Sequence, residues 1–135
     1  MKRDAFERYI EEKYGVQPES PWMKSPEFHV FRHSGNKKWF ALTMTIPKNR
    51  LGFKVDTMTD VVNLKCDPLM IGPLRDNKKI FPAYHMNKEN WVTVLLDGSA
   101  DSEVLTMLLG ISFCMTAPKL KRRRLPSKDE DRDLM

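Results

Sequence analysis

Apolar residues near the start of the chain recur at helical intervals. Phe6 and Ile10 lie one turn apart, the repeat continues to Tyr14, and Gly15 then interrupts it. This spacing predicts an amphipathic helix over residues 4–14, whose charged residues, Glu7 included, would form its solvent face.

After a Pro-rich link, apolar and polar residues begin to alternate, as in strands that have one buried face. The pattern predicts strands at 28–33, 38–46, 61–66 and 91–96. In the second of these, one face would carry Phe40, Leu42, Met44 and Ile46 and the other Trp39, Ala41, Thr43 and Thr45. The first set would face the core, and the second would leave a half-apolar face.

Turn and cap residues place the remaining elements. Asp67 before Pro68 is typical of a helix start, and Asp101 or Ser99 would cap a last apolar helix. The stretch 81–84 reads as extended because Pro fixes its own φ and restricts the preceding residue. Residues 47–58 form a basic excursion that could fold as a wing-like hairpin.

These elements give the order α-β-β-β-α-β-β-α and predict an α+β fold, a two-layer sandwich with an antiparallel sheet and its helices on one face. Residues 1–118 would form a single domain, and residues 119–135, rich in charges of both signs, a disordered tail. We expect one core, made by Phe6, Ile10, Phe40, Leu42, Val62, Leu64, Val92, Val94, Leu105 and Leu108.

Composition favours a cytoplasmic protein with no membrane contact. The N-terminus is charged and lacks the apolar stretch of a signal peptide. Cys66 and Cys114 lie in apolar surroundings without metal-ligand spacing, so both are expected to be reduced core residues. The net charge of +5 is concentrated in residues 24–88, which hold twelve Lys or Arg against five Asp or Glu. That distribution indicates a positive surface able to contact phosphates.

One stretch is unusual in its density of Pro, aromatic, His and Asn residues: FPAYHMNKENW at 81–91. Together with NLKCDP at 63–68, KWFA at 38–41 and LDG at 96–98, it resembles the signature of the MmcQ/YjbR family of small bacterial proteins, over roughly residues 4–116. The resemblance implies an architecture like that of secretion chaperones and a proposed double-wing contact with DNA, in which two hairpins straddle the duplex. Its signature residues here are Lys65, Pro82, Tyr84, His85, Asn87 and Trp91.

Catalytic and metal sites find little support in the sequence. His29 and His33 share a strand face but have no recognisable carboxylate partner, and no set of three or four metal ligands is evident. His85 has two readings: a partly buried ring, hydrogen-bonded to backbone, that orients the turn at Asn87, or a phosphate donor or general base. The first is favoured because no nucleophile accompanies it, and Ser112 lies on a core face of the last helix. We therefore expect no cofactor and no enzymatic activity.

Basic residues at predicted loops make DNA the first candidate partner. If these loops share one edge, the basic side chains would form a continuous rim, with Trp39 or Trp91 as stacking surfaces. The residues of this basic rim are Lys37, Lys38, Lys48, Arg50, Lys54, Lys78, Lys79 and Lys88. Binding would be weak and largely independent of sequence.

The alternative is a protein-interaction module, chaperone-like or dimeric. It would use the half-apolar sheet face of His29, Phe31, Trp39 and Thr43 to bind another protein or a second copy of the chain. The two functions differ in their expected dependence on salt, because phosphate contacts release counterions and apolar contacts do not.

Overall fold

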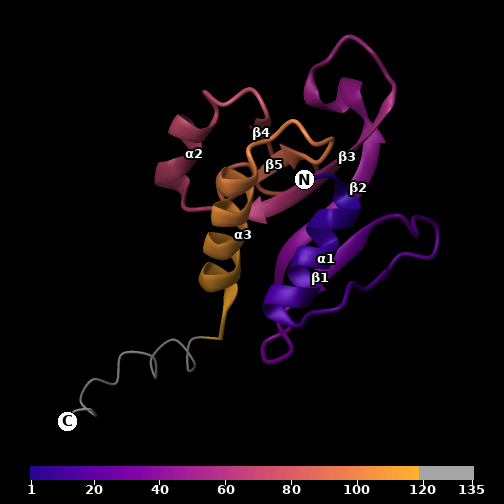
Figure 1. Cartoon of the computed structure of the whole chain (residues 1–135). Coiled ribbons are helices and arrows are strands. Elements are labelled where there is room, and N and C mark those ends of the chain that lie inside the picture. The colour runs from indigo at the N-terminus through magenta and orange to yellow at the C-terminus, as the bar shows by residue number, and fades with distance from the viewer. Residues whose placement is uncertain (119–135) are drawn as a thin grey trace.

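The computed structural model describes residues 1–118; the predicted tail at 119–135 lies outside the described residues. The elements follow the predicted order (Figure 1): α1 (Arg3–Tyr14), β1 (His29–Arg32), β2 (Trp39–Pro47), the 3₁₀ turn η1 (Lys48–Leu51), β3 (Met58–Lys65), α2 (Pro68–Leu74), β4 (Ile80–Pro82), β5 (Trp91–Leu95) and α3 (Ser102–Thr116).

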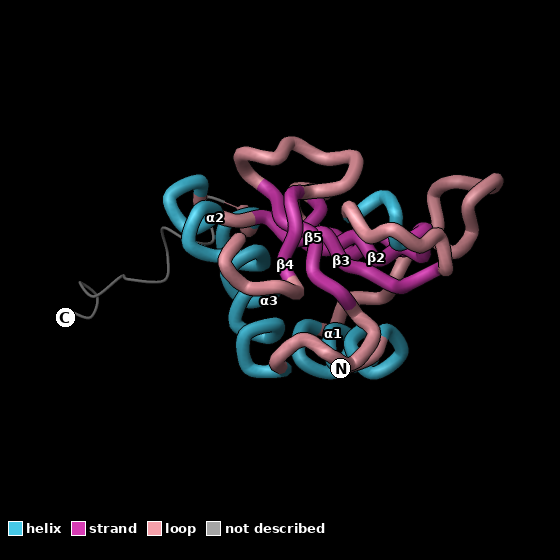
Figure 2. Tube along the Cα trace, turned by 90° about the horizontal axis from the view of Figure 1, so that it is seen from above, coloured by secondary structure: helices cyan, strands magenta, loops and turns pink. Residues whose placement is uncertain are grey.

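The five strands form one antiparallel sheet in the order β1-β2-β3-β5-β4. Helices α1 and α3 lie along one face of this sheet, whereas loops cover the other face (Figure 2). The α+β prediction, with helices on one face of an antiparallel sheet, is confirmed. Among residues 1–118, no helix is long and apolar enough to cross a bilayer.

All ten predicted core residues are buried, but they do not form one core. Nine belong to the cluster beneath the helices, and Leu42 belongs to a second cluster on the opposite face. A bulge in β2 causes the difference: Arg32 pairs with Trp39 while Phe31 pairs with Ala41, which leaves Phe40 as an extra residue. The extra residue turns Phe40 to the helix side, so the prediction that Phe40 and Leu42 share a face is wrong.

The helix-covered face is the half-polar one, because α1 supplies polar partners to it. Thr43 Oγ1 donates to Glu7 Oε2 at 2.6 Å, and Arg3 Nη1 donates to Thr45 Oγ1 at 2.9 Å. Glu7 also lies 2.9 Å from His29 Nδ1. Two predictions are therefore wrong: Glu7 points into the sheet rather than to solvent, and His29 does have a carboxylate partner.

Burial alone would raise the pKa of Glu7, but hydrogen bonds from Thr43, Arg3 and His29 outweigh it and hold that pKa below its ordinary value. The carboxylate is therefore fixed as an anion between α1 and β2. Its contacts bind the first helix to the sheet, which leaves this cluster a structural role.

The basic excursion after β2 is not a separate pair of strands. It consists of η1 and a loop to β3, which begins at Met58, earlier than predicted. Lys48 Nζ lies 5.4 Å from the ring centroid of Phe53, and the Phe53 and Phe81 rings lie 5.7 Å apart. The Phe53–Phe81 contact fastens the β2–β3 connection, residues 48–57, to β4, where the signature stretch begins.

The cysteines occupy different environments. Neither forms a disulfide among the described residues, but only Cys66 is buried, and burial raises the pKa of its thiol. Cys114 is exposed, which corrects the expectation that both are core residues.

Candidate binding site on the open face of the sheet

A buried polar pair interrupts the otherwise apolar loop-covered face, which we call the open face. Asn63 of β3 and Thr93 of β5 are register partners at the centre of the sheet, and both are fully buried. Thr93 Oγ1 donates to Asn63 Oδ1 and accepts from Tyr84 N at 2.9 Å, while Asn63 Nδ2 donates to Tyr84 O at 2.7 Å. Both backbone polar groups of Tyr84 are thus held by the sheet, which fixes the β4–β5 loop, residues 83–90, over the open face.

His85 follows this anchor in an unfavourable backbone conformation, with φ of 62°. A side chain at such an angle costs roughly 1–2 kcal/mol relative to ordinary backbone. Its ring is exposed, lies 3.9 Å from the Tyr84 ring between centroids, and makes no hydrogen bond within residues 1–118. The favoured reading of His85 as a partly buried, hydrogen-bonded ring is therefore wrong. The turn that follows does not depend on it, because Asn87 Oδ1 itself accepts from Glu89 N at 2.7 Å.

His85 is one of three basic side chains that line a pocket of about 440 Å³. Arg50 enters from η1 and Lys88 from the β4–β5 loop. The rest of the wall is formed by Leu51, Phe81, Pro82, Ala83 and Tyr84. No carboxylate lines this cationic pocket, and no ion pair joins any of the three to a described residue. Arg50 and Lys88 are both positively charged, so their convergence favours an anionic ligand.

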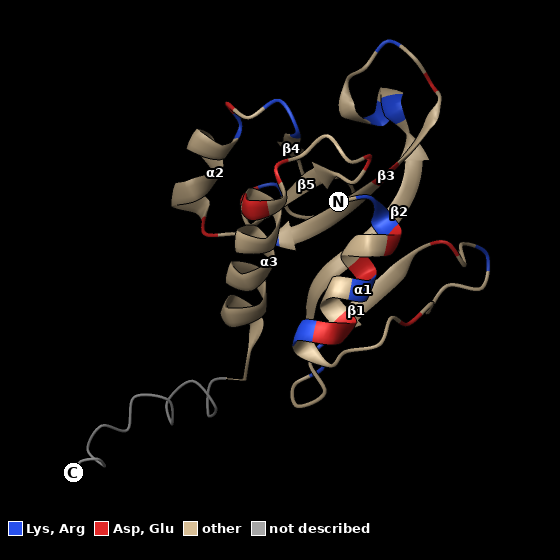
Figure 3. Ribbon diagram, viewed as in Figure 1, with Lys and Arg blue, Asp and Glu red and all other residues tan. Residues whose placement is uncertain are grey.

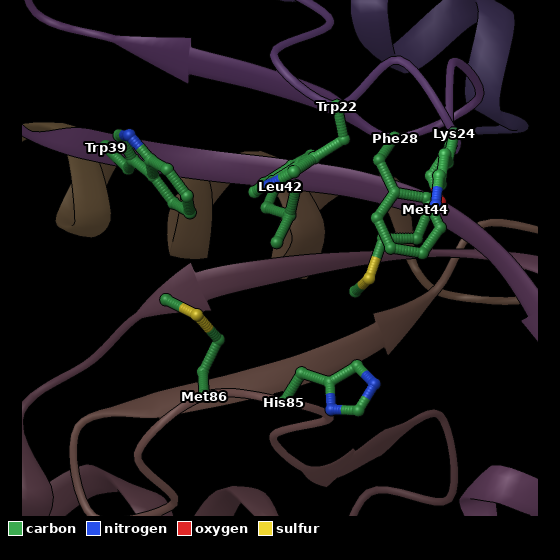
Figure 4. Close-up of a pocket in the computed structure, with 9 residues that line it drawn as sticks. Trp22, Lys24, Phe28, Trp39, Leu42, Met44, His85 and Met86 are labelled. Atoms are coloured by element: carbon green, nitrogen blue, oxygen red, sulfur yellow. The ribbon is translucent and has the colours of Figure 1, made fainter.

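A second, mainly apolar hollow adjoins the cationic pocket, and His85 lines both. This apolar groove has a volume of about 430 Å³. Figure 4 shows side chains of β2 and the α1–β1 link along one side and His85 and Met86 on the other. The lining residues are Trp22, Lys24, Ser25, Phe28, Trp39, Leu42, Met44, His85 and Met86.

The aromatic side of the groove is rigidly built. The Trp22 ring stands edge-on to Trp39 and to Phe28, at centroid distances of 5.6 Å and 6.1 Å. Its link is tied to the sheet edge, where Glu19 exchanges backbone hydrogen bonds with Val30. Trp22 nevertheless remains 39% exposed, so it presents aromatic surface to a ligand.

The predicted basic rim is divided by the strands. Lys37 and Lys38 precede β2, and η1 follows it, so the two groups are separated by nine residues of strand, or roughly 30 Å. Figure 3 shows basic residues of η1 and of the α2–β4 connection toward the end of the sheet away from the β1–β2 turn. A single continuous rim is therefore wrong. The structure instead brings Arg50 and Lys88 to one pocket.

The remaining rim residues take two positions. Lys48 and Lys54 lie in the β2–β3 connection with Arg50, and Lys78 and Lys79 lie between α2 and β4. Burial raises the pKa of the Asp97 carboxyl, but hydrogen bonds from Ser99 outweigh this and lower it. The positive charge of nearby Lys79 lowers that pKa further.

The predicted protein-binding face is largely covered. Phe31 and Thr43 are fully buried on the helix side, and His29 is engaged with Glu7 there. Trp39 alone of the four lies on the open face, since the bulge at Phe40 reverses the alternation.

Ser112 and the signature residues Lys65, Pro82 and Trp91 serve the framework. Ser112 Oγ donates to Phe40 O at 2.6 Å and accepts from Lys65 N at 2.9 Å, which satisfies backbone groups beside the bulge. Pro82 ends β4 opposite Val92, and Trp91 begins β5 opposite Lys65.

The structure places no metal-ligand cluster in the described part of the chain: no group of three or more His, Cys, Asp or Glu residues could hold an ion there. His33 is buried, with Nε2 3.0 Å from Phe113 O and 2.9 Å from Thr116 Oγ1. Such contacts are those of a core histidine.

Sequence reasoning missed the apolar groove and the pair that anchors its loop. Asn63 stands inside the strand pattern VVNLK, where a polar residue interrupts an apolar run, and that interruption was the available signal. Trp22 gave a weaker one, as a Trp within a Pro-rich link. No local pattern indicated that this link and the β4–β5 loop meet across the sheet.

Comparison with known proteins agrees with this architecture. A crystal structure of a Pseudomonas syringae protein is 45% identical, with a TM-score of 0.85, over 87% of this chain and 100% of that one. Deinococcus radiodurans DR2400, whose domain is described as DUF419, is 27% identical with a TM-score of 0.67, over 92% of this chain and 87% of that one.

Sequence relatives point to the same group. The uncharacterized protein YyaQ of Bacillus subtilis (strain 168) is 35% identical over 116 residues, which are 86% of this chain and 98% of YyaQ. Residues 11–115 match the family described as YjbR. On these grounds the chain belongs to the YjbR family.

Proposed function

We propose that this protein is a non-catalytic nucleic-acid-binding protein that contacts phosphates around the cationic pocket. The observation that carries the proposal is the convergence of Arg50, His85 and Lys88, from two separate loops, on one hollow without a carboxylate. A phosphate would supply the missing negative charge, and Arg50 could bind it through two parallel N–H groups.

The two loops correspond to the two wings that the family resemblance implies. The β2–β3 connection contributes Lys48, Arg50 and Lys54, and the β4–β5 loop contributes His85 and Lys88. The ring contact of Phe53 with Phe81 keeps the first wing against the strand leading into the second. Because this support is built from packed rings, the cations are held near one another before any ligand arrives.

The proposal predicts weak binding that depends steeply on salt. Four phosphate contacts, from Lys48, Arg50, Lys54 and Lys88, give an expected slope of log affinity against log salt of about −3 to −4. Affinity at physiological salt should lie at roughly 10⁻⁴ to 10⁻⁶ M, because no helix within residues 1–118 presents an array of base-reading side chains.

The test is fluorescence anisotropy with a labelled random-sequence duplex over a series of salt concentrations. Lys48→Glu combined with Arg50→Glu should flatten the slope by about two units. Lys37→Glu combined with Lys38→Glu is the matched control, since it makes the same charge change at the far end of β2. Lack of binding by the wild type at low salt, or equal flattening by both pairs, would overturn the proposal.

A protein contact through the open face is the second candidate, and the apolar groove is the observation that favours it. Its partner would be another protein or a second copy of this chain. In that case binding would persist as salt rises and would not respond to the Lys48→Glu, Arg50→Glu pair.

A further inference from the structure

We infer that the apolar groove accepts an unstacked base, so that this protein prefers single-stranded nucleic acid to duplex. The inference rests on the proposed function and assigns its substrate class. It starts from the placement of the groove, which shares His85 as a common wall with the cationic pocket.

The two hollows match the two parts of a nucleotide. A base has flat apolar faces and stacks on aromatic side chains, whereas its phosphate carries the charge. Here Trp22 and Trp39 border the groove, and Arg50 and Lys88 border the pocket beyond His85. A base in the groove thus leaves its phosphate beside the cations.

Charge supports the same assignment. Lys24 lines the end of the groove contributed by the α1–β1 link, so positive side chains lie on both sides of the apolar surface. No Asp or Glu lines either hollow. A strand of nucleic acid, with phosphates on both sides of each base, is complementary to this pattern.

A duplex cannot use the groove, because its bases are paired and stacked inside. It can still reach the cations through its phosphates, which explains how duplex binding and single-strand preference can coexist. Stacking of one base is worth about 1–3 kcal/mol, or roughly 5- to 150-fold in affinity.

A peptide fits the groove less well. The groove lies over β2, which is already paired on both sides with β1 and β3, so an extended peptide would find no free strand edge.

The backbone of His85 adds a reason to expect a ligand at this junction. The His85 side chain is exposed and makes no hydrogen bond within residues 1–118, so no hydrogen bond of its own offsets the energetic cost of a φ of 62°. The Asn63 and Thr93 anchor imposes this conformation from the preceding residue. Backbone strain held in this way is typical of binding sites.

The experiment follows the intrinsic Trp fluorescence of the full chain at low salt during titration with a 12-nucleotide thymidine strand or a 12-base-pair duplex. We expect the single strand to quench the emission and to bind at least about 10-fold more tightly than the duplex. Trp22→Ala should remove about 10-fold of single-strand affinity and leave duplex affinity and the salt slope unchanged. Met23→Ala, the neighbouring residue at 96% exposure, is the control and should change neither.

Each alternative outcome is distinct. Equal affinities for strand and duplex, with Trp22→Ala neutral, would overturn the inference while the proposed function stands. Absence of binding to either would overturn both. Tighter binding of an acidic, Trp-containing peptide that displaces the thymidine strand would assign the groove to a protein partner instead. If Trp22→Ala also lowers the urea midpoint, Met86→Ala on the opposite wall of the groove takes its place in the test. That variant must then lose single-strand affinity while keeping duplex affinity.

Discussion

Replacing Asn63 by Leu should destabilise the protein mainly through the polar groups it leaves behind. Leu is branched at Cγ like Asn but is bulkier and can make no hydrogen bond. The change leaves the carbonyl of Tyr84, which now accepts from Asn63 Nδ2 at 2.7 Å, without a donor. It also leaves the hydroxyl hydrogen of Thr93 without an acceptor, although Thr93 Oγ1 still accepts from Tyr84 N. Each unsatisfied buried group costs about 1–3 kcal/mol, so we expect a loss of roughly 3 kcal/mol.

Urea denaturation of four proteins measures this: wild type, Asn63→Leu, Thr93→Val and the double variant. Thr93→Val leaves Tyr84 N and Asn63 Oδ1 without partners, and its expected cost is also roughly 2–3 kcal/mol. The bond between Asn63 and Thr93 is counted in both single changes. The double variant should therefore cost at least about 1 kcal/mol less than the sum of the two.

Additive costs, within about 0.3 kcal/mol, would refute the reasoning, because independent sites add and members of one network do not. A loss below about 1 kcal/mol for Asn63→Leu would refute it as well. A loss of the expected size lowers the melting temperature by about 10 °C and leaves a folded protein, since domains of this kind have about 5–15 kcal/mol of stability.

Three further predictions concern other parts of the fold. The free energy of unfolding should fall as pH decreases through the lowered pKa of Glu7, because the folded state favours the carboxylate. Glu7→Gln should be about 2 kcal/mol less stable than wild type at pH 7, and its free energy of unfolding should fall less than that of wild type on acidification to pH 3. Residue 85 has a φ of 62°, which Gly adopts freely and Val adopts poorly. In urea denaturation, the free energy of unfolding of His85→Gly should equal that of wild type or exceed it by up to about 1 kcal/mol, and that of His85→Val should be about 1–2 kcal/mol lower. The reverse order would mean that the backbone at residue 85 is not strained. Ser112→Ala should cost about 2 kcal/mol in the same assay because it orphans Phe40 O and Lys65 N, whereas Ser112→Thr, which keeps the hydroxyl, tests for crowding alone.

The chain's local patterns determined its elements and their order. Apolar spacing around Phe6 and Ile10 specifies α1, and Asp67 before Pro68 specifies the start of α2, because both signals act within one or two turns of backbone. Alternation specified the strands, and the stretch at 81–91 was recognisable as the segment on which the site is built.

Tertiary structure decided which face of the sheet is open and which side chains meet there. One extra residue at Phe40 shifts the alternation of β2, and a bulge depends on the pairing of two strands rather than on either one alone. Glu7 lies inward because Thr43 and His29, distant in sequence, offer it hydrogen bonds. Arg50 and Lys88 share a pocket, while Lys37 is a strand length away, because only the folding of both connections over the sheet sets those distances. Periodicity along a chain encodes a direction for each side chain, but the partner that each one meets is fixed by contacts between segments far apart in sequence.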